Sequence, residues 1–562
     1  MSSIFAIFDI GVRAMYAQQT ALQITGQNIS NANNENYVRQ RAELKEATPF
    51  NAVPGQLGSG VSIEQIIRIK DDFTDYQLQK ENQNLGYLDE KNNILEQLEN
   101  IFSEPSDNGL NSVISGFYDS LHDLSNYPEN FSSRVMVREQ GLTLCDSFNN
   151  TIDKINELKS NINENIVFKV DEINAITADI ADLNNQISRA EVGGIQNAND
   201  LRNQRDALVR KLCEMGDIFV QEGDDNLLYV QLGDTIIVSG VHQIELKAQT
   251  DPENNVGIVS GDSNKNVKIS NGSLKALFDT RDDVLDKYID DLNTLARSII
   301  TELNDVHTGG IGLTMYQSAT AENGAISSTV PLANAGYDFP VNGGSFTISL
   351  YDSARNLKSE TKITINPFSD TLNDIAAKIN AISGLNATIS SDNKLSIATS
   401  NPTDQFSFLG DSDGAKDTSN FLQAAGLNTF FKGKDASSIT LADYIINDVN
   451  KIATGKSTAP GDNSNIIEMI GTRDIAFVDG AKPEDFFSSM IGDLGVERQV
   501  TIKRSETQQL ILSSLEDRFQ SQSGVSFDEE AINLIKYQRG YQAAAKFIQV
   551  MDGLINSLIQ LM

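Results

Sequence analysis

A seven-residue apolar repeat runs between residues 527 and 562. Its two apolar positions are occupied by Leu534, Tyr541, Ile548 and Ile555 and, three residues further on, by Tyr537, Ala544, Met551 and Leu558. Apolar residues with this spacing predict a helix whose stripe faces another helix. Ser526, followed three residues later by Glu529, predicts the start of the helix by a capping box. The partner is therefore another helix of the chain, a helix of another copy, or both.

A second stripe begins near the N-terminus, between residues 4 and 29. Phe8, Met15, Leu22 and Ile29 are spaced by seven, and several alanines widen the apolar face around them. A wide face rich in small residues suits close contact with more than one neighbour. We therefore predict a terminal α-helical coiled coil, an assembly domain made of residues 1–50 and 524–562.

Long helical patterns continue through the first half of the chain and predict a long-helix bundle. Helices are expected at 71–102, 109–126 and 131–191, and the last carries Ile166, Ile173, Ile180 and Ile187 at seven-residue spacing. This isoleucine row needs facing helices, and the candidates are 199–215, 272–307 and 506–522. We assign 60–215, 270–312 and 462–522 to the bundle.

The apolar period changes to two in the middle of the chain, which predicts β structure. Residues 216–269 contain hairpin signals, and with 313–335 they are assigned to a small β domain. Residues 336–431 predict two strands, an amphipathic helix and a hairpin, in that order, and 432–461 are assigned as a connector back to the bundle. The expected fold is mainly α with inserted β domains, the outer ones being α+β or β.

Two sequence motifs lie near the two ends of the chain. Residues 22–40 read LQITGQNISNANNENYVRQ, and residues 523–548 read SGVSFDEEAINLIKYQRGYQAAAKFI. Both resemble the terminal signatures of the flagellar rod, hook and hook-associated axial protein family. The matching positions are Asn28, Ile29, Asn31, Tyr37, Arg39 and Gln40, and Asp528, Glu529, Tyr537, Gln538 and Tyr541. The chain departs from the family at 34–36, where the family usually has Thr, Pro and Gly. Residues 336–431 resemble the flagellin hook IN motif.

The resemblance implies a structural subunit of the bacterial flagellum, most similar to the hook-associated member that joins hook to filament. It implies export by the flagellar type III system, an extracellular location and self-association in a ring through the terminal helices. The implied partners are the hook protein, hook-associated protein 3 and an export chaperone that binds the C-terminal helix. The alternatives are another axial protein of hook or rod, an axial scaffold carrying an enzyme in its insert, and a type III translocator.

Composition and short motifs limit the kinds of partner and site that we expect for this chain. With 77 acidic against 44 basic residues the net charge is −33, so nucleic acid and membrane surfaces are poor partners. Residues 455–457 read GKS, but Asn450 stands where a phosphate loop needs its first Gly. The three histidines lie far apart in sequence, and Cys145 and Cys213 are expected to be buried small hydrophobes. We therefore predict neither an enzyme nor a metal or cofactor site.

Overall fold

The computed structural model describes residues 2–52, 55–102, 109–193, 196–224, 226–408 and 416–561; within these, side chains 2–5, 50, 52, 558, 559 and 561 are outside the description. The chain is mainly α-helical with inserted β domains, and it divides into two compact units. Unit 1 comprises 1–94, 161–280 and 499–562, and unit 2 comprises 95–160 and 281–498. Three long helices contribute residues to both units: α2 (Asp72–Phe102), α4 (Phe131–Ala190) and α12 (Pro483–Ser523).

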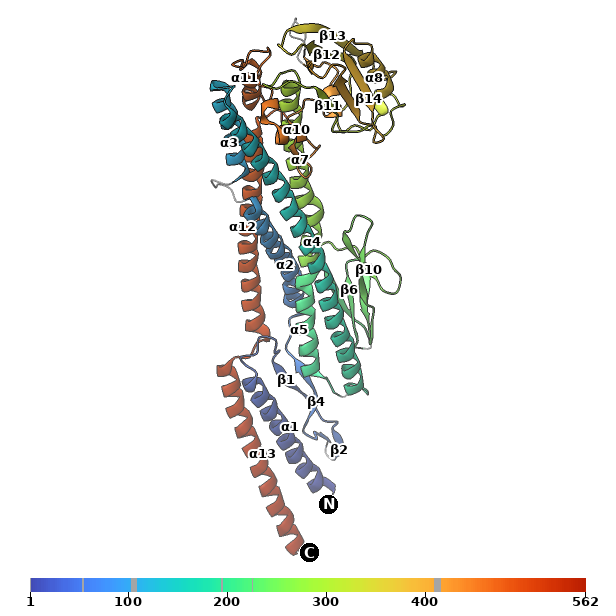
Figure 1. The fold of residues 1–562 in the computed structure, drawn as a ribbon. Helices are drawn as coiled ribbons and strands as arrows, with labels where there is room; N and C mark the ends of the chain where they lie inside the picture. Colours follow the sequence, from blue (N-terminus) through green and yellow to red (C-terminus); the bar gives the residue numbers. More distant parts are fainter. Residues whose placement is uncertain are drawn as a thin grey trace. The chain divides into compact units, whose positions relative to one another are not determined.

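Unit 1 contains the two terminal helices and four groups of paired strands (Figure 1). Its helices are α1 (Ser2–Ser30), α5 (Asn199–Met215), α6 (Gly272–Asp279) and α13 (Phe527–Leu561). Its strands are β1 (Gln40–Glu46), β2 (Phe50–Ala52), β3 (Gly55–Leu57), β4 (Val61–Arg68), β5 (Ile218–Glu222), β6 (Leu228–Leu232), β7 (Thr235–Ser239), β8 (His242–Gln243), β9 (Leu246–Thr250) and β10 (Val256–Ser260). Strands β5 to β8 form an antiparallel sheet in sequence order, and β9–β10, β2–β3 and β1–β4 are antiparallel pairs.

Unit 2 contains the other helices and the inserted sheets. Its helices are α3 (Leu110–Asn126), α7 (Asp286–Thr308), α8 (Leu372–Asn380), α9 (Phe421–Ala425), α10 (Asp443–Asn447) and α11 (Ser464–Gly471), and a π-helical turn, Thr280–Leu285, precedes α7. Its strands are β11 (Ser318–Thr320), β12 (Gly344–Tyr351), β13 (Leu357–Ile365), β14 (Leu385–Ile389), β15 (Leu395–Thr399), β16 (Gln405–Ser407), β17 (Phe431–Lys432) and β18 (Thr440–Leu441).

The isoleucine row of α4 forms core, as its spacing predicted. Ile166, Ile173, Ile180 and Ile187 are all completely buried. The expected helix at 506–522 is longer than predicted, because α12 begins at Pro483. Its first half was missed since Gly492 and Gly495 interrupt the apolar pattern, and glycine inside a helix is unfavourable.

The boundaries predicted for the β domains need two corrections. First, β11 pairs with β15, in the order β11–β15–β14, so residues 313–335 belong with the insert and not with 216–269. Second, the insert does not extend to residue 431. Phe430 and Phe431 pack on Phe117 of α3, with ring centroids 5.6 and 5.7 Å apart. The end of the predicted insert is therefore core of the helical part of unit 2.

The predicted connector, 432–461, is also core. Leu441 and Ile452 are completely buried. The buried Arg134 of α4 donates to the carbonyl of Ile452 at 2.8 Å and to Thr454 Oγ1 at 2.9 Å. A buried guanidinium with these acceptors fixes the segment to α4, so it is more than a link between domains.

Candidate assembly surface of the terminal helices

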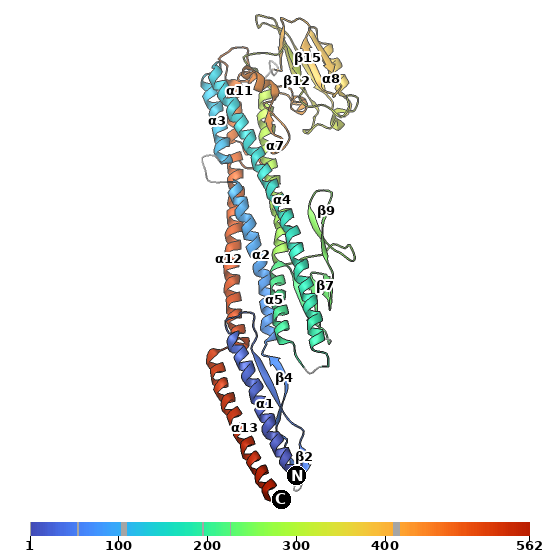
Figure 2. The same ribbon diagram turned by 60° about the horizontal axis from the view of Figure 1, so that its bottom comes forward.

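The two terminal helices pair with each other, and they lie side by side in both ribbon views (Figures 1 and 2). Asn28 contacts Glu530, Gln18 approaches Gly540, and Gly11 faces Ile548, so the two helices run antiparallel. A Cβ added at Gly11 would lie 2.8 Å from Cγ1 of Ile548. The helices therefore approach most closely where one of them has no side chain.

The predicted apolar rows take different positions in this pair. On α13, Ala544 and Met551 are buried, Tyr537, Tyr541, Ile548 and Ile555 are half-buried, Leu534 is exposed, and the side chain of Leu558 lies outside the described part. On α1, Phe8, Met15, Leu22 and Ile29 are all half-buried, whereas Ala17, Ala21, Ile24 and Asn28 are buried. The partner of the α13 repeat thus includes α1 of the same chain, where Gly11 and Gln18 lie against Ile548 and Gly540.

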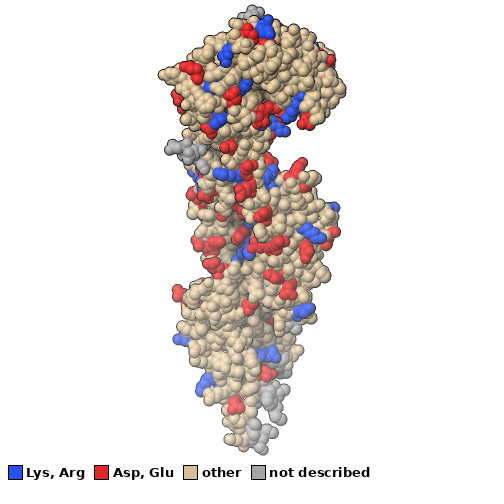
Figure 3. All heavy atoms as spheres, in the orientation of Figure 1, with Lys and Arg blue, Asp and Glu red and all other residues tan. Residues whose placement is uncertain are grey.

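A second apolar stripe lies beside the buried row of α13. Ile532, Phe547, Val550 and Leu554 are 66, 40, 53 and 53 % exposed. At 100° per residue Ile532, Val550 and Leu554 fall within about 40° of each other and about 60 to 120° from Ala544 and Met551. Phe547 lies between the two rows and also approaches Gly11 of α1. Figure 3 shows that the visible face over α1 and α13 carries few charged side chains. A helix with two apolar faces, of which one is covered, presents the other to a neighbour.

Three signature residues meet Glu530 in a buried cluster at the end of this helix pair. Asn28 Nδ2 donates to the carbonyl of Gln40 at 2.9 Å and to Glu530 Oε2 at 3.1 Å. Asn28 Oδ1 accepts from the Tyr37 hydroxyl at 2.9 Å and from the Gln40 amide at 3.1 Å. Burial, followed by the carboxylates of Asp200 and Glu530, raises the pKa of Tyr37 well above its ordinary value. The Asn28 side chain is thus fully bonded inside the protein.

Arg39 connects this cluster to the start of α13. Its Nε and Nη2 donate to Glu530 Oε1 at 2.9 and 2.6 Å, and its Nη1 donates to Glu529 Oε2 at 2.6 Å. Burial lowers the pKa of Arg39, but the hydrogen bonds to Glu530 and Glu529 outweigh it, and the net change is upward. The capping box is half formed, since Ser526 Oγ accepts from the amide of Glu529 at 3.4 Å while the Glu529 carboxylate is bonded to Arg39.

Two residues of this cluster are not among the matching positions given for the signatures. Glu530 lies inside the C-terminal motif, in the run DEE, and is also a polar residue within the apolar repeat of α13. Asp200 of α5 accepts from Gln40 Nε2 at 2.8 Å and from Gln27, and it had no sequence signal. The exposed Asp528 and Gln538 stay outside the cluster.

The turn after α1 forms without the proline and glycine of the family pattern. Asn31 Nδ2 donates to the carbonyl of Gln27 at 3.0 Å, and the Tyr37 amide donates to the carbonyl of Asn34 at 3.0 Å. The Asn36 amide donates to Asn34 Oδ1 at 3.2 Å. Asparagine side chains therefore replace the rigidity that a proline would supply.

The GKS segment of unit 2 holds a carboxylate where a phosphate would need to bind. Asp462 Oδ2 accepts from the Lys456 amide at 2.9 Å and from Ser457 Oγ at 2.6 Å, and Lys456 Nζ pairs with Glu468. Burial raises the pKa of Asp462, but hydrogen bonds from Ser457 and Ser464 lower it to about 2. Among the described residues, no cluster of three His, Cys, Asp or Glu side chains has a metal-binding arrangement, and no helix has the length and apolar character of a membrane span.

Two family models match the chain. Residues 95–320 match the model described as flagellar hook-associated protein FlgK helical domain. Residues 516–561 match the model described as flagellar basal body rod FlgEFG protein C-terminal. The second match covers all of α13, the helix that carries both apolar stripes.

Relatives that match over nearly their whole length are also flagellar hook-associated proteins. The chain is 28 % identical to flagellar hook-associated protein 1 of Bacillus subtilis, over 100 % of this chain and 98 % of the relative. It is 26 % identical to flagellar hook-associated protein 1 of Salmonella typhimurium, over 99 % and 100 %. The structure of the flagellar hook junction protein FlgK from Burkholderia pseudomallei covers 80 % of this chain and 100 % of its own, with a TM-score of 0.53 and 15 % identity, and therefore has a similar fold. The terminal motifs resemble those of flagellar hook-associated proteins. These matches extend the resemblance to the whole chain.

Proposed function

We propose that this chain, which resembles flagellar hook-associated proteins over its whole length, is hook-associated protein 1, the structural subunit that joins hook to filament. The observation that supports this most directly is the pairing of the two signature ends. Residues 502 positions apart, Asn28 and Glu530, meet in one buried cluster that holds α1 against α13. The pairing leaves one apolar stripe of α13 uncovered, and neighbouring copies and axial partners would cover it in the assembled flagellum.

The role is structural and not catalytic. Each copy contributes its helix pair to a closed ring between hook and filament, in which the same heterologous contact repeats from copy to copy. The partners are the hook protein on one side and hook-associated protein 3 on the other. The location is the extracellular flagellum.

Export needs the uncovered stripe to be protected. Before assembly, Phe547, Val550 and Leu554 would expose a continuous apolar surface. We propose that the flagellar type III system exports the chain after a dedicated chaperone has bound α13. Removal of residues 527–562 should abolish chaperone binding in a pull-down from cells. Unchanged binding would place the chaperone site elsewhere.

Labelled electron microscopy tests the proposed position. Flagella isolated from cells with an epitope in an exposed loop of this chain should carry the label in one narrow band between hook and filament. Label along the hook, or within the rod, would identify the chain as another axial protein. Absence of label from isolated flagella would contradict the proposal altogether.

A further inference from the structure

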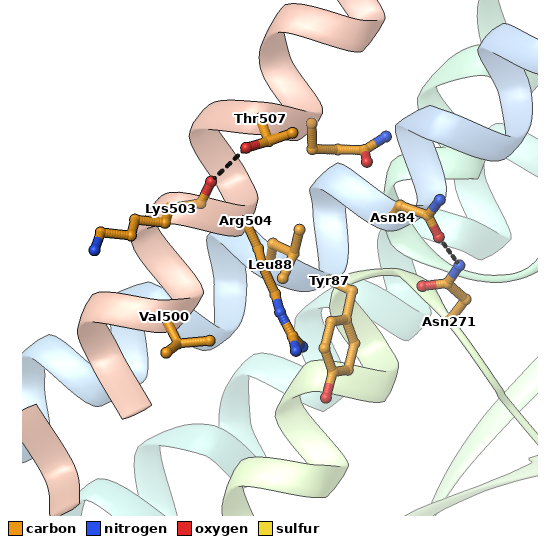
Figure 4. Close-up of a pocket in the computed structure, with 9 residues that line it drawn as sticks. Asn84, Tyr87, Leu88, Asn271, Val500, Lys503, Arg504 and Thr507 are labelled. Atoms are coloured by element: carbon orange, nitrogen blue, oxygen red, sulfur yellow. Dashed lines mark hydrogen bonds between the residues drawn. The ribbon is translucent and has the colours of Figure 1, made fainter. Parts of the chain in front are cut away.

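A groove between α2 and α12 in unit 1 has no role in the surface described so far (Figure 4). It has a volume of about 580 Å³, and Tyr87, Leu88, Val500 and Arg504 line it. Arg504 extends from α12 toward Tyr87, whereas the neighbouring Lys503 points away from it (Figure 4). Arg504 forms no ion pair among the described residues. The groove thus combines the apolar side chains of Leu88 and Val500 with the cation of Arg504.

Arg504 belongs to a stripe on α12. Val500, Arg504, Thr507 and Ile511 follow one another at spacings of four, three and four, which places them on one side of the helix. Val500 is 42 % and Ile511 43 % exposed. An exposed helical stripe of this kind fits a second helix that brings apolar and acidic residues at the same spacing.

The unit 1 part of α4 carries such a stripe. Glu164, Phe168 and Asp171 are exposed and follow one another at spacings of four and three. Phe168 is 67 % exposed, which is unusual for an aromatic side chain in the middle of a long helix. Glu164 and Asp171 form no ion pair among the described residues, although Lys169 and Glu172 beside them pair with Glu90 and Lys211.

We propose that the α4 stripe of one copy docks into the α2–α12 groove of a second copy. Phe168 occupies the apolar floor between Leu88 and Val500, and Asp171 pairs with Arg504. The two surfaces are different, so the contact is head-to-tail and can repeat around a ring. The proposal rests on the proposed function, because it supplies a contact between copies of the assembled subunit. Charge complementarity supports it, since Arg504 on one surface and Glu164 and Asp171 on the other are opposite charges that form no ion pair in the described part of the chain.

Disulfide trapping tests the contact in isolated flagella. The two native cysteines are free and buried, and burial raises the pKa of Cys145 and Cys213, so neither thiol interferes. A chain with both Phe168→Cys and Val500→Cys should give a ladder of linked multimers on oxidation, and reduction should collapse it. Each single variant should remain monomeric. If the double variant is incorporated at the junction but gives no ladder, the proposed contact is overturned. The proposed function is then unaffected. Absence of every variant, and of the parent chain, from flagella would overturn both.

Charge exchange gives a second test that does not depend on the geometry of a disulfide. Arg504→Glu and Asp171→Arg should each lower the amount of chain retained on isolated hooks by about tenfold, and their combination should restore it to within about twofold. Lys503→Glu, with the same change of charge one residue away, should have a much smaller effect. Equal losses for Lys503→Glu and Arg504→Glu, or no recovery in the combined variant, would overturn the proposal.

Discussion

Glu530 is the residue on which the pairing of the terminal helices depends most. Its side chain is 2 % exposed and holds both Arg39 and Asn28, whereas the Glu529 side chain is 61 % exposed and holds only Arg39. The same arginine therefore has one buried and one solvated partner. Removal of a buried partner leaves an uncompensated charge, while solvent compensates for the loss of an exposed one.

Glu530→Ala should lower the free energy of local opening of α1 and α13 by about 2 to 3 kcal/mol. Their amides should exchange with solvent about 30 to 150 times faster, because 1.4 kcal/mol corresponds to a factor of ten. Hydrogen exchange of the purified chain measures this effect. The matched control, Glu529→Ala, should change exchange less than about fivefold. Equal effects of the two variants would show that burial does not determine the strength of this contact.

His307 should make unit 2 sensitive to acid. Its Nε2 accepts from the Ala453 amide at 3.0 Å, so its Nδ1 carries the proton and donates to the carbonyl of Asn428 at 2.7 Å. Burial, with a smaller contribution from Arg134, lowers the pKa of His307 to about 4, although the bond to Asn428 raises it. Between pH 6.5 and 4 the unfolded state binds the proton that the folded state excludes. Stability therefore falls as the pH falls through this range, by on the order of 3 kcal/mol.

Urea unfolding of the helical part of unit 2 at pH 7 and pH 4.5 measures this dependence. His307→Gln should flatten it, even if the variant is less stable at both pH values. His122 is exposed, so His122→Gln should keep the dependence of the parent chain. If the free energy of unfolding falls by the same amount between pH 7 and pH 4.5 in His307→Gln and in the parent chain, His307 is not the cause of the pH dependence.

At the scale of elements, two glycines of α1 differ in their surroundings. A Cβ at Gly11 would meet Ile548 and Phe547 of α13 at 2.8 and 2.9 Å, while a Cβ at Gly26 would meet nothing within 4 Å. Alanine is favoured over glycine inside a helix by about 1 kcal/mol. Gly26→Ala should therefore slow the hydrogen exchange of α1, whereas Gly11→Ala should give no such gain or accelerate the exchange of α13. Slower exchange in both variants would mean that the two helices are not closely packed at Gly11.

The part of the insert that holds β12 to β16 can be excised where its two ends meet. Asn342 N donates to the carbonyl of Ser419 at 2.8 Å, so removal of 343–418 leaves ends that already meet. This deletion, closed by a short Gly/Ser linker, should keep the melting transition of the helical part of unit 2. Deletion of 336–431 also removes Phe430, Phe431 and the carbonyl that pairs with His307, and it should abolish that transition. Calorimetry of the two deletion variants measures this melting transition in each. A normal melt for the longer deletion would restore the boundary that the sequence predicts.

Sequence patterns predicted the elements better than they predicted their partners. The isoleucine row of α4 and the repeat of α13 are periodic, and period alone specifies a helix and its apolar side. Gly11 and Gln18 of α1, which lie against α13, are on the side of the helix that carries the predicted row, but a glycine and a glutamine add no hydrophobic signal to that row. The bond between Asn28 and Glu530 and the packing of Phe430 on Phe117 join distant segments, and no local pattern contains that information.

At the scale of the molecule, charge and apolar surface are distributed unequally. The chain has a net charge of −33, yet the visible face over its terminal helices carries few charges (Figure 3). Strong like charge keeps unassembled copies apart, while uncharged helical ends can still pack. Such a distribution suits the proposed assembly, in which copies stay apart until their terminal helices pack.

Two adjacent residues of α13 provide the most direct test of this account. Val550 is 53 % exposed on the outer stripe, and Met551 is 7 % exposed against α1. Val550→Asp should leave hydrogen exchange of the purified chain unchanged but prevent its retention between hook and filament, since assembly would bury an unpaired carboxylate in every copy. Met551→Asp should accelerate exchange in both terminal helices before any assembly. The measurement is the amount of each variant on isolated hooks, compared with its exchange in solution. Normal retention of Val550→Asp would contradict the claim that the outer stripe of α13 joins the copies.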